Sequence, residues 1–353
     1  MSRPDGTDLL VDATVLAQFS DFAEPLEGEQ AVPLARVLVA AGYSAVDTLH
    51  VAVEGDGSES SFLWTSVADE AWWLSDGSLA VGDKRLRASR VEVEPPPLAD
   101  AVEASITDVA PTVAVALGLQ VPSEAMGQAL QVPAANRAIL IFLDGFGYTR
   151  YTEALAGGLI PNLAALGRPL VAVTTFPPIT SVSTASLLTG APPDVHGVDQ
   201  RGMRKTDTET LFDVAVSAGL RILTVEGESL AFELRGAESQ LSADLDGNGS
   251  TDDNVLANAL EVLRADEWDI LLVHFHGVDD AGHTYGPGAP EERAAIQQED
   301  GAVGRIIELL PEGTLVIVFA DHGMHQVEEE GRLGNHGQLV QRDMFIPIFL
   351  VSK

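Results

Sequence analysis

The residues between 171 and 190 combine the features expected of a phosphate-binding turn. They read VAVTTFPPITSVSTASLLTG, which is an apolar strand, two prolines and then a helix start rich in hydroxyl side chains. Pro177 and Pro178 exclude helical backbone just before Thr180, so a helix is predicted to begin there. Because the free amides of a helix N-terminus attract anions, a hydroxyl held beside them could attack a phosphoryl group. The alternative is that these hydroxyls only cap the helix.

Carboxylate and imidazole side chains follow the ends of other predicted strands or lie in the loops beyond them. With the threonine they form a set of three aspartates, three histidines and one hydroxyl: Asp144, Thr180, Asp279, His283, Asp321, His322 and His336. In a parallel sheet such groups meet at one edge. Oxygen and nitrogen donors without sulfur suit zinc or manganese. Seven donors exceed the needs of one tetrahedral ion, and their joint placement suits two ions about 4 Å apart.

Six apolar runs are predicted to be the strands that position these groups. They are continuous, as in strands buried on both faces, and span residues 138–143, 170–176, 221–227, 269–276, 314–320 and 345–351. Helical patterns between most of them predict an α/β fold, in which helices cover a mostly parallel sheet. His274 and His276 alternate on one strand and point to the same face. His276 is either a neighbour of the ligands or an ordinary buried histidine.

A different pattern fills residues 8–93. Short β-rich runs, including LLVDATVLAQF at 9–19, accompany one helical segment at 33–42 that ends at Gly42. This predicts a small α+β domain without a cluster of metal-ligand side chains. The stiff EPPPL segment at 94–98 is the predicted linker. It divides the chain into a small domain of residues 1–97 and a larger one of residues 98–353.

The amino-acid composition limits the classes of molecule that this chain is expected to bind. The chain has 353 residues, of which 46% are hydrophobic, and is long enough to bury a large core. Acidic residues outnumber basic ones by 53 to 20, which gives a net charge of −33. This charge argues against a nucleic-acid polymer and against a membrane surface as partner. Local cations must therefore recruit any anionic substrate.

The sequence contains no cysteine, which excludes disulfides, thiolate metal sites and a cysteine nucleophile. The first residues, MSRPDGTDLLVDATVL, lack an apolar core of signal-peptide length, and no run approaches the length of a membrane span. The absence of cysteine, of a signal-peptide core and of a run long enough to span a membrane leads us to expect a cytoplasmic protein.

Five motifs mark residues 99–351: LDGFG at 143–147, FPPITSVSTASLLTGAPPDVHG at 176–197, VDDAGHTYGP at 278–287, ADHGM at 320–324 and NHG at 335–337. Together they resemble the alkaline phosphatase superfamily, and within it the nucleotide pyrophosphatase/phosphodiesterase-like branch. The resemblance implies a three-layer αβα sandwich with a mostly parallel central sheet. It also implies a metal-dependent enzyme that hydrolyses phosphodiester, phosphomonoester or phosphonate bonds.

Residue by residue, the resemblance implies two zinc sites, with manganese as the other candidate metal. The first site would consist of Asp279, His283 and His336, and the second of Asp144, Asp321 and His322. Counting back from Thr189 and Gly190 places Thr180, and not Thr174 or Thr175, at the family's nucleophile position. Thr180 would also bind the second zinc and form a phospho-threonine intermediate.

Arg201 departs from the family pattern. The phosphodiesterases have an asparagine five residues after the His of the His-Gly motif, and this chain has Arg201 there. A guanidinium could bind a more highly charged phosphoryl group bidentately, which would favour a monoester or phosphonate over a diester. The alternative is that Arg201 faces solvent with Arg204 and Lys205 in a basic loop.

Residues 106–130 resemble a segment that the superfamily carries after its last strand. The sequence ITDVAPTVAVALGLQVPSEAMGQAL has that form, yet here it precedes the first catalytic strand. The resemblance implies a circularly permuted catalytic domain, with residues 105–131 being the usual C-terminal segment moved to the front. Thr107 or Asp108 would cap its helix, and Gly118 would end it. An amphipathic linker helix is the alternative.

The expected substrate is a small phosphorylated molecule, with nucleotides among the candidates. Two other functions remain open. A phosphomutase of the same superfamily would need a cap domain, and the only extra domain here is small. A catalytically inactive metal-binding or regulatory protein would be expected to lack at least one donor, whereas all seven are present. The sequence predicts no oligomeric state.

Overall fold

The computed structural model describes residues 1, 4, 11, 13–26, 28–54, 58–329 and 331–353. These divide into two compact units: residues 1–101 with 338–341, and residues 102–337 with 342–353. The linker predicted at 94–98 lies close to the end of the first unit's main segment. The domain assignment itself, with its permuted segment, stays a prediction.

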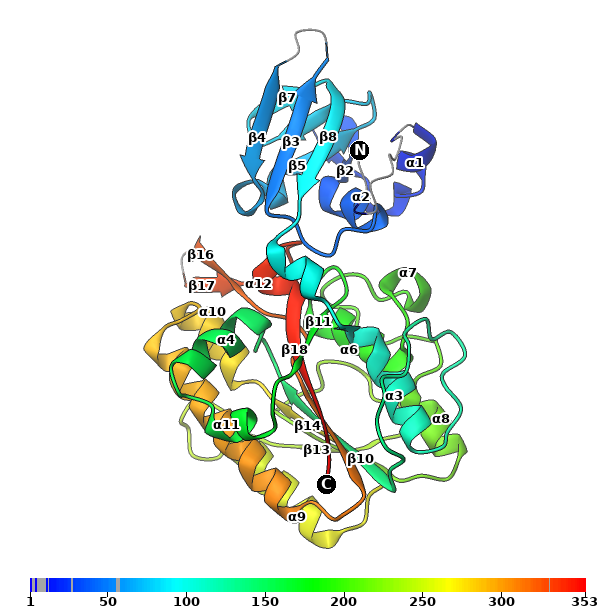
Figure 1. Cartoon of the computed structure of the whole chain (residues 1–353), viewed down its shortest axis with the longest axis vertical. Helices are drawn as coiled ribbons and strands as arrows, with labels where there is room; N and C mark the ends of the chain where they lie inside the picture. Colours follow the sequence, from blue (N-terminus) through cyan, green and yellow to red (C-terminus); the bar gives the residue numbers. More distant parts are fainter. Residues whose placement is uncertain (2–3, 5–10, 12, 27, 55–57, 330) are drawn as a thin grey trace. The chain divides into compact units, whose positions relative to one another are not determined.

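The first unit contains two antiparallel sheets and short helices. Its elements are α1 (Ala13–Ala17), β1 (Glu24–Leu26), β2 (Glu29–Pro33), α2 (Leu34–Ala40), β3 (Thr48–Val53), β4 (Glu59–Leu63), β5 (Ala71–Leu74), β6 (Leu79–Val81), β7 (Lys84–Leu86) and β8 (Ala88–Glu94). The sheet orders are β1-β2-β5-β6-β7 and β4-β3-β8. The expected helix at 33–42 is present as α2 (Figure 1). The run at 9–19 contains the helix α1 where β structure was expected, and part of this run lies outside the described residues.

The second unit is built on a large mostly parallel sheet. The strands are β9 (Ala104–Ser105), β10 (Arg137–Leu143), β11 (Leu170–Val173), β12 (Ile222–Glu226), β13 (Glu238–Leu241), β14 (Ile270–Phe275), β15 (Thr314–Phe319) and β18 (Phe345–Ser352). Their order is β13-β12-β14-β10-β15-β18-β11-β9, and among these described strands only β18 runs against the others. Every residue of β14 and β15 is buried, which explains their continuous apolar sequences.

Register aligns the strand ends that carry the predicted ligands. Leu143 of β10 pairs with Phe275 of β14, and Phe142 pairs with Phe319 of β15. The residues that follow these three strands therefore emerge at one edge of the sheet. A parallel sheet with its functional groups at the carboxyl edge is the arrangement that the sequence predicted.

Helices of the second unit form two contacting groups around the sheet. The elements are α3 (Val109–Ala116), α4 (Tyr148–Ala156), α5 (Pro161–Ala165), α6 (Thr180–Thr189), α7 (Pro193–His196), α8 (Leu211–Ser217), α9 (Asp252–Ala265), α10 (Gly277–Tyr285), α11 (Pro290–Leu309) and, apart from its first residue, α12 (Gln341–Met344). Helices α3, α7 and α8 contact α6, whereas α5, α9 and α10 contact α11. The mixed α/β class is thus confirmed, while the separation into three layers stays a prediction.

The segment at 104–130 belongs to the second unit. Strand β9 pairs with β11, which lies next to β18, and α3 packs on α6 and α8 (Figure 1). Of the two expected caps, Asp108 stands at the N-cap position of α3, but its side chain caps no amide of that helix; the side-chain cap belongs to Ser105, before the single turn at residues 106–108. Ser105 accepts the Thr107 N–H, and the Asp108 carboxylate accepts the Ser105 N–H. A reciprocal pair of this kind satisfies two amides at once, so Ser105 takes the capping position.

Candidate metal centre

Each predicted donor is placed by a strand end or a helix turn. Asp144 follows β10, Asp321 and His322 follow β15, and Thr180 is the first residue of α6. Asp279 and His283 lie four residues apart on α10, so both point to the same side of the helix. His336 follows β17 (Arg332–Asn335), which pairs with β16 (His325–Glu329) in a hairpin.

The structure brings Asp279, His283 and His336 together, and their ligand atoms lie within 4.8 Å of one another. His283 Nε2 lies 3.2 Å from Asp279 Oδ2, and His336 Nε2 lies 3.8 Å from Asp279 Oδ1. One carboxylate and two imidazoles are a donor set that zinc accepts. These three residues are called the Asp279 group below.

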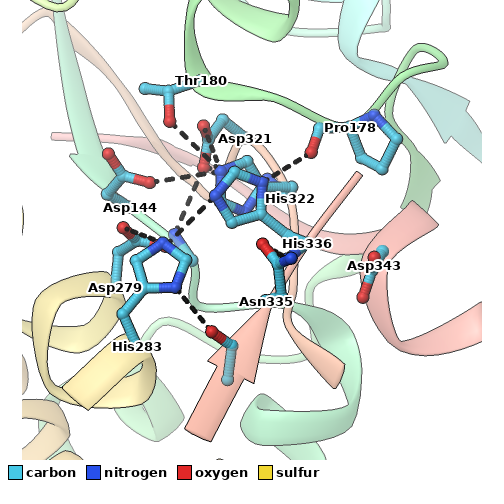
Figure 2. A network of polar contacts seen from close by, with 12 residues as sticks. Asp144, Pro178, Thr180, Asp279, His283, Asp321, His322, Asn335, His336 and Asp343 are labelled. Atoms are coloured by element: carbon cyan, nitrogen blue, oxygen red, sulfur yellow. Dashed lines mark hydrogen bonds and ion pairs between the residues drawn. The ribbon is translucent and has the colours of Figure 1, made fainter. Parts of the chain in front are cut away.

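A second set, called the Asp144 group, consists of Asp144, Asp321 and His322, again with ligand atoms within 4.8 Å. His322 Nε2 lies 3.2 Å from Asp321 Oδ2 and 3.5 Å from Asp144 Oδ1. The Thr180 hydroxyl is 3.2 Å from the same nitrogen (Figure 2). The His322 and His336 rings stack with centroids 3.7 Å apart, so the two groups are adjacent.

The three histidines share one orientation. Nδ1 of His283, His322 and His336 lies 2.8 to 3.1 Å from the backbone oxygens of Gly334, Gly323 and Pro178, respectively. Because a carbonyl only accepts, Nδ1 carries the proton and the Nε2 lone pair faces the carboxylates. With that tautomer, the Thr180 hydroxyl donates to Nε2 of His322. Fixing a histidine through its other nitrogen is how proteins orient metal ligands.

Three carboxylate oxygens of the two groups lack hydrogen-bond donors. Asp144 Oδ1, Asp279 Oδ1 and Asp321 Oδ2 are all buried, and among the described residues none of them has a hydrogen-bond partner. A buried anion without a partner is costly, and a cation between the groups would remove that cost. The donor types and these orphaned oxygens therefore fit divalent metal ions.

The pKa directions of these side chains agree with that fit. Burial, followed by the charges of Asp144 and Asp279, raises the pKa of Asp321 well above its ordinary value. Burial lowers the pKa of His322 to about 4 and that of His336 to about 3, so both imidazoles are neutral at pH 7. Crowded carboxylates beside neutral imidazoles make a site that attracts cations.

Asp144 is also held from the side of β14. His274 bridges two carboxylates, with Nε2 3.1 Å from Asp144 Oδ2 and Nδ1 2.9 Å from Glu226 Oε2. Burial opposes its protonation, but Glu226 and Asp144 together raise the pKa of His274 to about 10. His276, the neighbour suggested by the sequence, lies farther away, with Nδ1 3.6 Å from Asp144 Oδ2. His274 is therefore the positioning residue for Asp144.

Two arginines border the groups. Although Arg201 is an exposed residue, its guanidinium is partly desolvated, which lowers its pKa, as does the charge of Arg332. The charges of Asp279 and Asp144 act on Arg201 in the opposite direction, so the guanidinium lies within electrostatic range of both carboxylates. Arg332 lies against His283. The sequence analysis missed Arg332, and its only signal there is a position four residues before His336.

The N-terminus of α10 is clamped by two buried acids that the sequence analysis also missed. Asp252 accepts the backbone N–H groups of His276 and Gly277 at 2.9 Å. Glu299 accepts the N–H of Val278 at 3.0 Å. Both acids sit on other helices, α9 and α11, so the clamp fixes the helix that carries Asp279 and His283.

Comparison with models of known protein families decides the family. Residues 138–219 and 224–345 match the family described as type I phosphodiesterase / nucleotide pyrophosphatase. The chain belongs to this family. All seven side chains predicted to bind metal lie within the two segments that match the family. The resemblance to that branch of the alkaline phosphatase superfamily is thereby confirmed.

Curated relatives include two human proteins. The chain is 29% identical over 148 residues to the catalytic subunit of GPI ethanolamine phosphate transferase 3, which covers 41% of this chain and 13% of that protein. It is 26% identical over 254 residues to the catalytic subunit of GPI ethanolamine phosphate transferase 2, which covers 63% of this chain and 24% of that protein. The chain thus spans less than a quarter of the length of each of these two relatives.

Similar solved structures include phosphonoacetate hydrolase from Sinorhizobium meliloti 1021 in complex with phosphonoacetate. Its TM-score is 0.46 at 20% identity, over 60% of this chain and 62% of that chain. Murine ectonucleotide pyrophosphatase / phosphodiesterase 5 gives a TM-score of 0.44 at 17% identity, over 55% and 59% of the two chains. Among the described residues of this family member, every helix is too short or too polar to cross a membrane.

Proposed function

We propose that the chain is a two-metal phosphoesterase, a hydrolase that uses Thr180 as its nucleophile. The observation that carries the proposal is the position of the Thr180 hydroxyl, 3.2 Å from His322 Nε2 and so at the Asp144 group. Family membership supports the phosphoester chemistry. The Asp144 and Asp279 groups would each hold one divalent ion, zinc before manganese, because each combines carboxylate with imidazole donors.

Each of the site residues would have its own role in the proposed reaction. Divalent ions bound at these groups would promote ionisation of a hydroxyl and neutralise phosphoryl charge. Thr180 Oγ1 attacks phosphorus in line, so the ester oxygen leaves on the side opposite Thr180, toward the Asp279 group. Water then cleaves the phospho-threonine, which restores Thr180 and releases phosphate from a monoester substrate, or a phosphomonoester or phosphonate from a diester or phosphonate ester. His274 holds Asp144, and the α10 clamp holds Asp279 and His283.

Arg201 would bind a non-bridging oxygen of the phosphoryl group. It replaces the asparagine of the family pattern, and its charge interacts with Asp279 and Asp144. A guanidinium compensates two negative charges better than a neutral amide does. We therefore propose a small phosphomonoester or phosphonate as the preferred substrate, and diesters, including nucleotide esters, as poorer ones.

Transfer to an alcohol is the second candidate reaction. It is favoured by the relatives, which are named as ethanolamine phosphate transferases. The two candidates share the attack by Thr180 and differ in whether water or an alcohol cleaves the intermediate. The phosphomutase and the inactive protein considered from the sequence have no such observation in their favour.

The domain arrangement completes the proposal. We propose that residues 98–353 form the three-layer αβα catalytic domain. Residues 105–131 would be the family's C-terminal segment moved to the front, as the contacts of β9 with β11 and of α3 with α6 support. We assign no role to residues 1–97.

The test is a substrate panel on the zinc-reconstituted protein. We expect release of p-nitrophenol from p-nitrophenyl phosphate, from bis(p-nitrophenyl) phosphate and from p-nitrophenyl phenylphosphonate, with the monoester fastest. Added ethanolamine or glycerol distinguishes the two reactions, because a transferase forms the new ester at the expense of free phosphate.

Arg201→Asn should lower the monoester-to-diester ratio of kcat/KM by about tenfold, the effect of one charge-assisted contact. No hydrolysis of any substrate would refute the proposal, and an unchanged ratio would assign Arg201 to solvent.

A further inference from the structure

Arg332 contacts a predicted metal ligand instead of a carboxylate. Its Nη2 lies 2.9 Å from both ring nitrogens of His283, and its Nε lies 3.1 Å from the Gly334 oxygen. An atom this close to both nitrogens would overlap Cε1 if it lay in the ring plane, so Nη2 lies over the ring face. The Nε2 lone pair of His283 therefore still points toward Asp279.

The positive charge of Arg332 is not neutralised by its own contacts. Among the described residues, its polar contacts are those with the His283 ring and its hydrogen bond to the Gly334 oxygen, in a chain that has 53 acidic side chains. Arg332 is half-buried, and it lies near enough to Arg201 for the two charges to interact. Two guanidinium groups in electrostatic range of each other, one of them without a carboxylate contact, favour an external anion.

The direction of attack tells which part of a substrate would meet Arg332. The Thr180 hydroxyl lies at His322, in the Asp144 group. Phosphoryl transfer proceeds with the attacking and leaving oxygens roughly in line, so the leaving group departs on the side opposite Thr180. Arg332 contacts His283 of the Asp279 group, which is the other of the two adjacent groups. Arg332 therefore borders the leaving-group side.

We propose that Arg332 binds a negatively charged substituent on the leaving group of the substrate, while Arg201 binds the transferred phosphoryl group. This inference rests on the proposed function. It narrows the substrate class to phosphoryl compounds whose leaving group itself carries a carboxylate or a second phosphate. The pair of arginines would also supply the local positive charge that a protein of net charge −33 needs to recruit such a polyanion.

The experiment compares aryl phosphates whose leaving groups differ in charge, and the comparison of each variant with wild type cancels their intrinsic differences in reactivity. kcat/KM is measured for phenyl phosphate, 4-carboxyphenyl phosphate and 1,4-phenylene bisphosphate with wild type, Arg332→Gln, Arg332→Lys and Arg204→Gln. We expect Arg332→Gln to lower the charged-to-uncharged ratio of kcat/KM at least about tenfold, as loss of one charge-assisted hydrogen bond does. Arg332→Lys should restore part of the ratio. Arg204, exposed on the Arg201 loop and bonded to the Leu230 oxygen, is the matched control and should leave it unchanged. The carboxylate and phosphate arms show which substituent is preferred.

Two further readouts separate binding from damage to the metal site. Zinc content of Arg332→Gln should equal that of wild type, because Nδ1 of His283 keeps its own bond to Gly334. In a Thr180→Ala background, which prevents turnover, the dissociation constant of 4-carboxyphenyl phosphate should rise about tenfold on Arg332→Gln. Equal losses for phenyl and 4-carboxyphenyl phosphate would overturn the role of Arg332 while leaving the proposed function intact. Wild-type protein that binds zinc but hydrolyses neither substrate would overturn both.

Discussion

Thr180 is the residue on which the proposed chemistry depends. The neighbouring candidates are engaged elsewhere, since the Thr174 hydroxyl lies 2.9 Å from Ser183 Oγ and the Thr175 hydroxyl lies 3.0 Å from Ser186 Oγ. The hydroxyl of Thr180 instead contacts His322. It does not cap α6 either, because the N-cap position belongs to Ile179.

We predict that Thr180→Ala binds metal like wild type but loses at least about a thousandfold in kcat, as expected for removal of a nucleophile. The other six donors remain, so metal content should not change. Thr180→Ser, which keeps a hydroxyl, should retain measurable turnover, and Thr175→Ala is the matched control that should behave like wild type. Stopped-flow hydrolysis of p-nitrophenyl phosphate measures the rates. Turnover of Thr180→Ala at the wild-type rate would mean that another group is the nucleophile.

The sequence predicted which residues gather at the site better than it predicted what supports them. The seven donors could be found because each stands at a recognisable strand end or in a recognisable motif. Glu226 and Arg332 could not, because their contacts depend on three-dimensional pairing. Glu226 reaches His274 across 48 residues of chain, and Arg332 reaches His283 across 49. No local spacing encodes those distances.

Helix α10 shows how one element depends on others. Its first amides are held by Asp252 and Glu299 from α9 and α11. Burial, and then the charge of Asp252, raises the pKa of Glu299 well above its ordinary value. A carboxyl whose pKa is raised on folding contributes most stability below its unfolded pKa, and loses it as pH rises through the folded value.

We therefore predict that Glu299→Gln is at least as stable as wild type at pH 8. Glutamine keeps the oxygen that accepts the Val278 N–H and carries no charge. As pH falls from 8 toward 5, the free energy of unfolding of wild type should increase relative to that of Glu299→Gln. Glu299→Ala, which loses both the contact and the buried volume, should cost about 2–4 kcal/mol. Urea unfolding across this pH range measures the differences. A stability difference between wild type and Glu299→Gln that does not vary with pH would contradict the claim that folding raises the pKa of Glu299.

Strands were predicted more accurately than caps and short helices. A run buried on both faces must be continuously apolar, so β10, β14, β15 and β18 were visible in the sequence. Ser105 was not recognised as the cap of the 106–116 segment, because several adjacent polar residues can fill that position and only the folded backbone selects one. Helix α1 was expected as β structure because an apolar run of that length suits either state.

At the scale of the whole molecule, a strongly acidic chain of net charge −33 has two adjacent carboxylate–imidazole groups with two arginines at their border. Carboxylates of the two groups would be balanced by metal ions, and Arg201 and Arg332 add positive charge at that border. The matched family segments begin at residue 138, so residues 1–101, the main segment of the first unit, lie outside them. The site donors and the sheet that positions them all belong to the second unit.

The central claim is that two adjacent donor groups each hold one metal ion, and metal content per chain tests it most directly. After zinc reconstitution and gel filtration, elemental analysis should give about two zinc ions per wild-type chain. Asp279→Asn should leave about one, since it disrupts only one group, and Asp144→Asn should likewise leave about one. Arg204→Gln should match wild type. Fewer than about one zinc per wild-type chain, or a zinc content that neither aspartate variant lowers, would contradict the account.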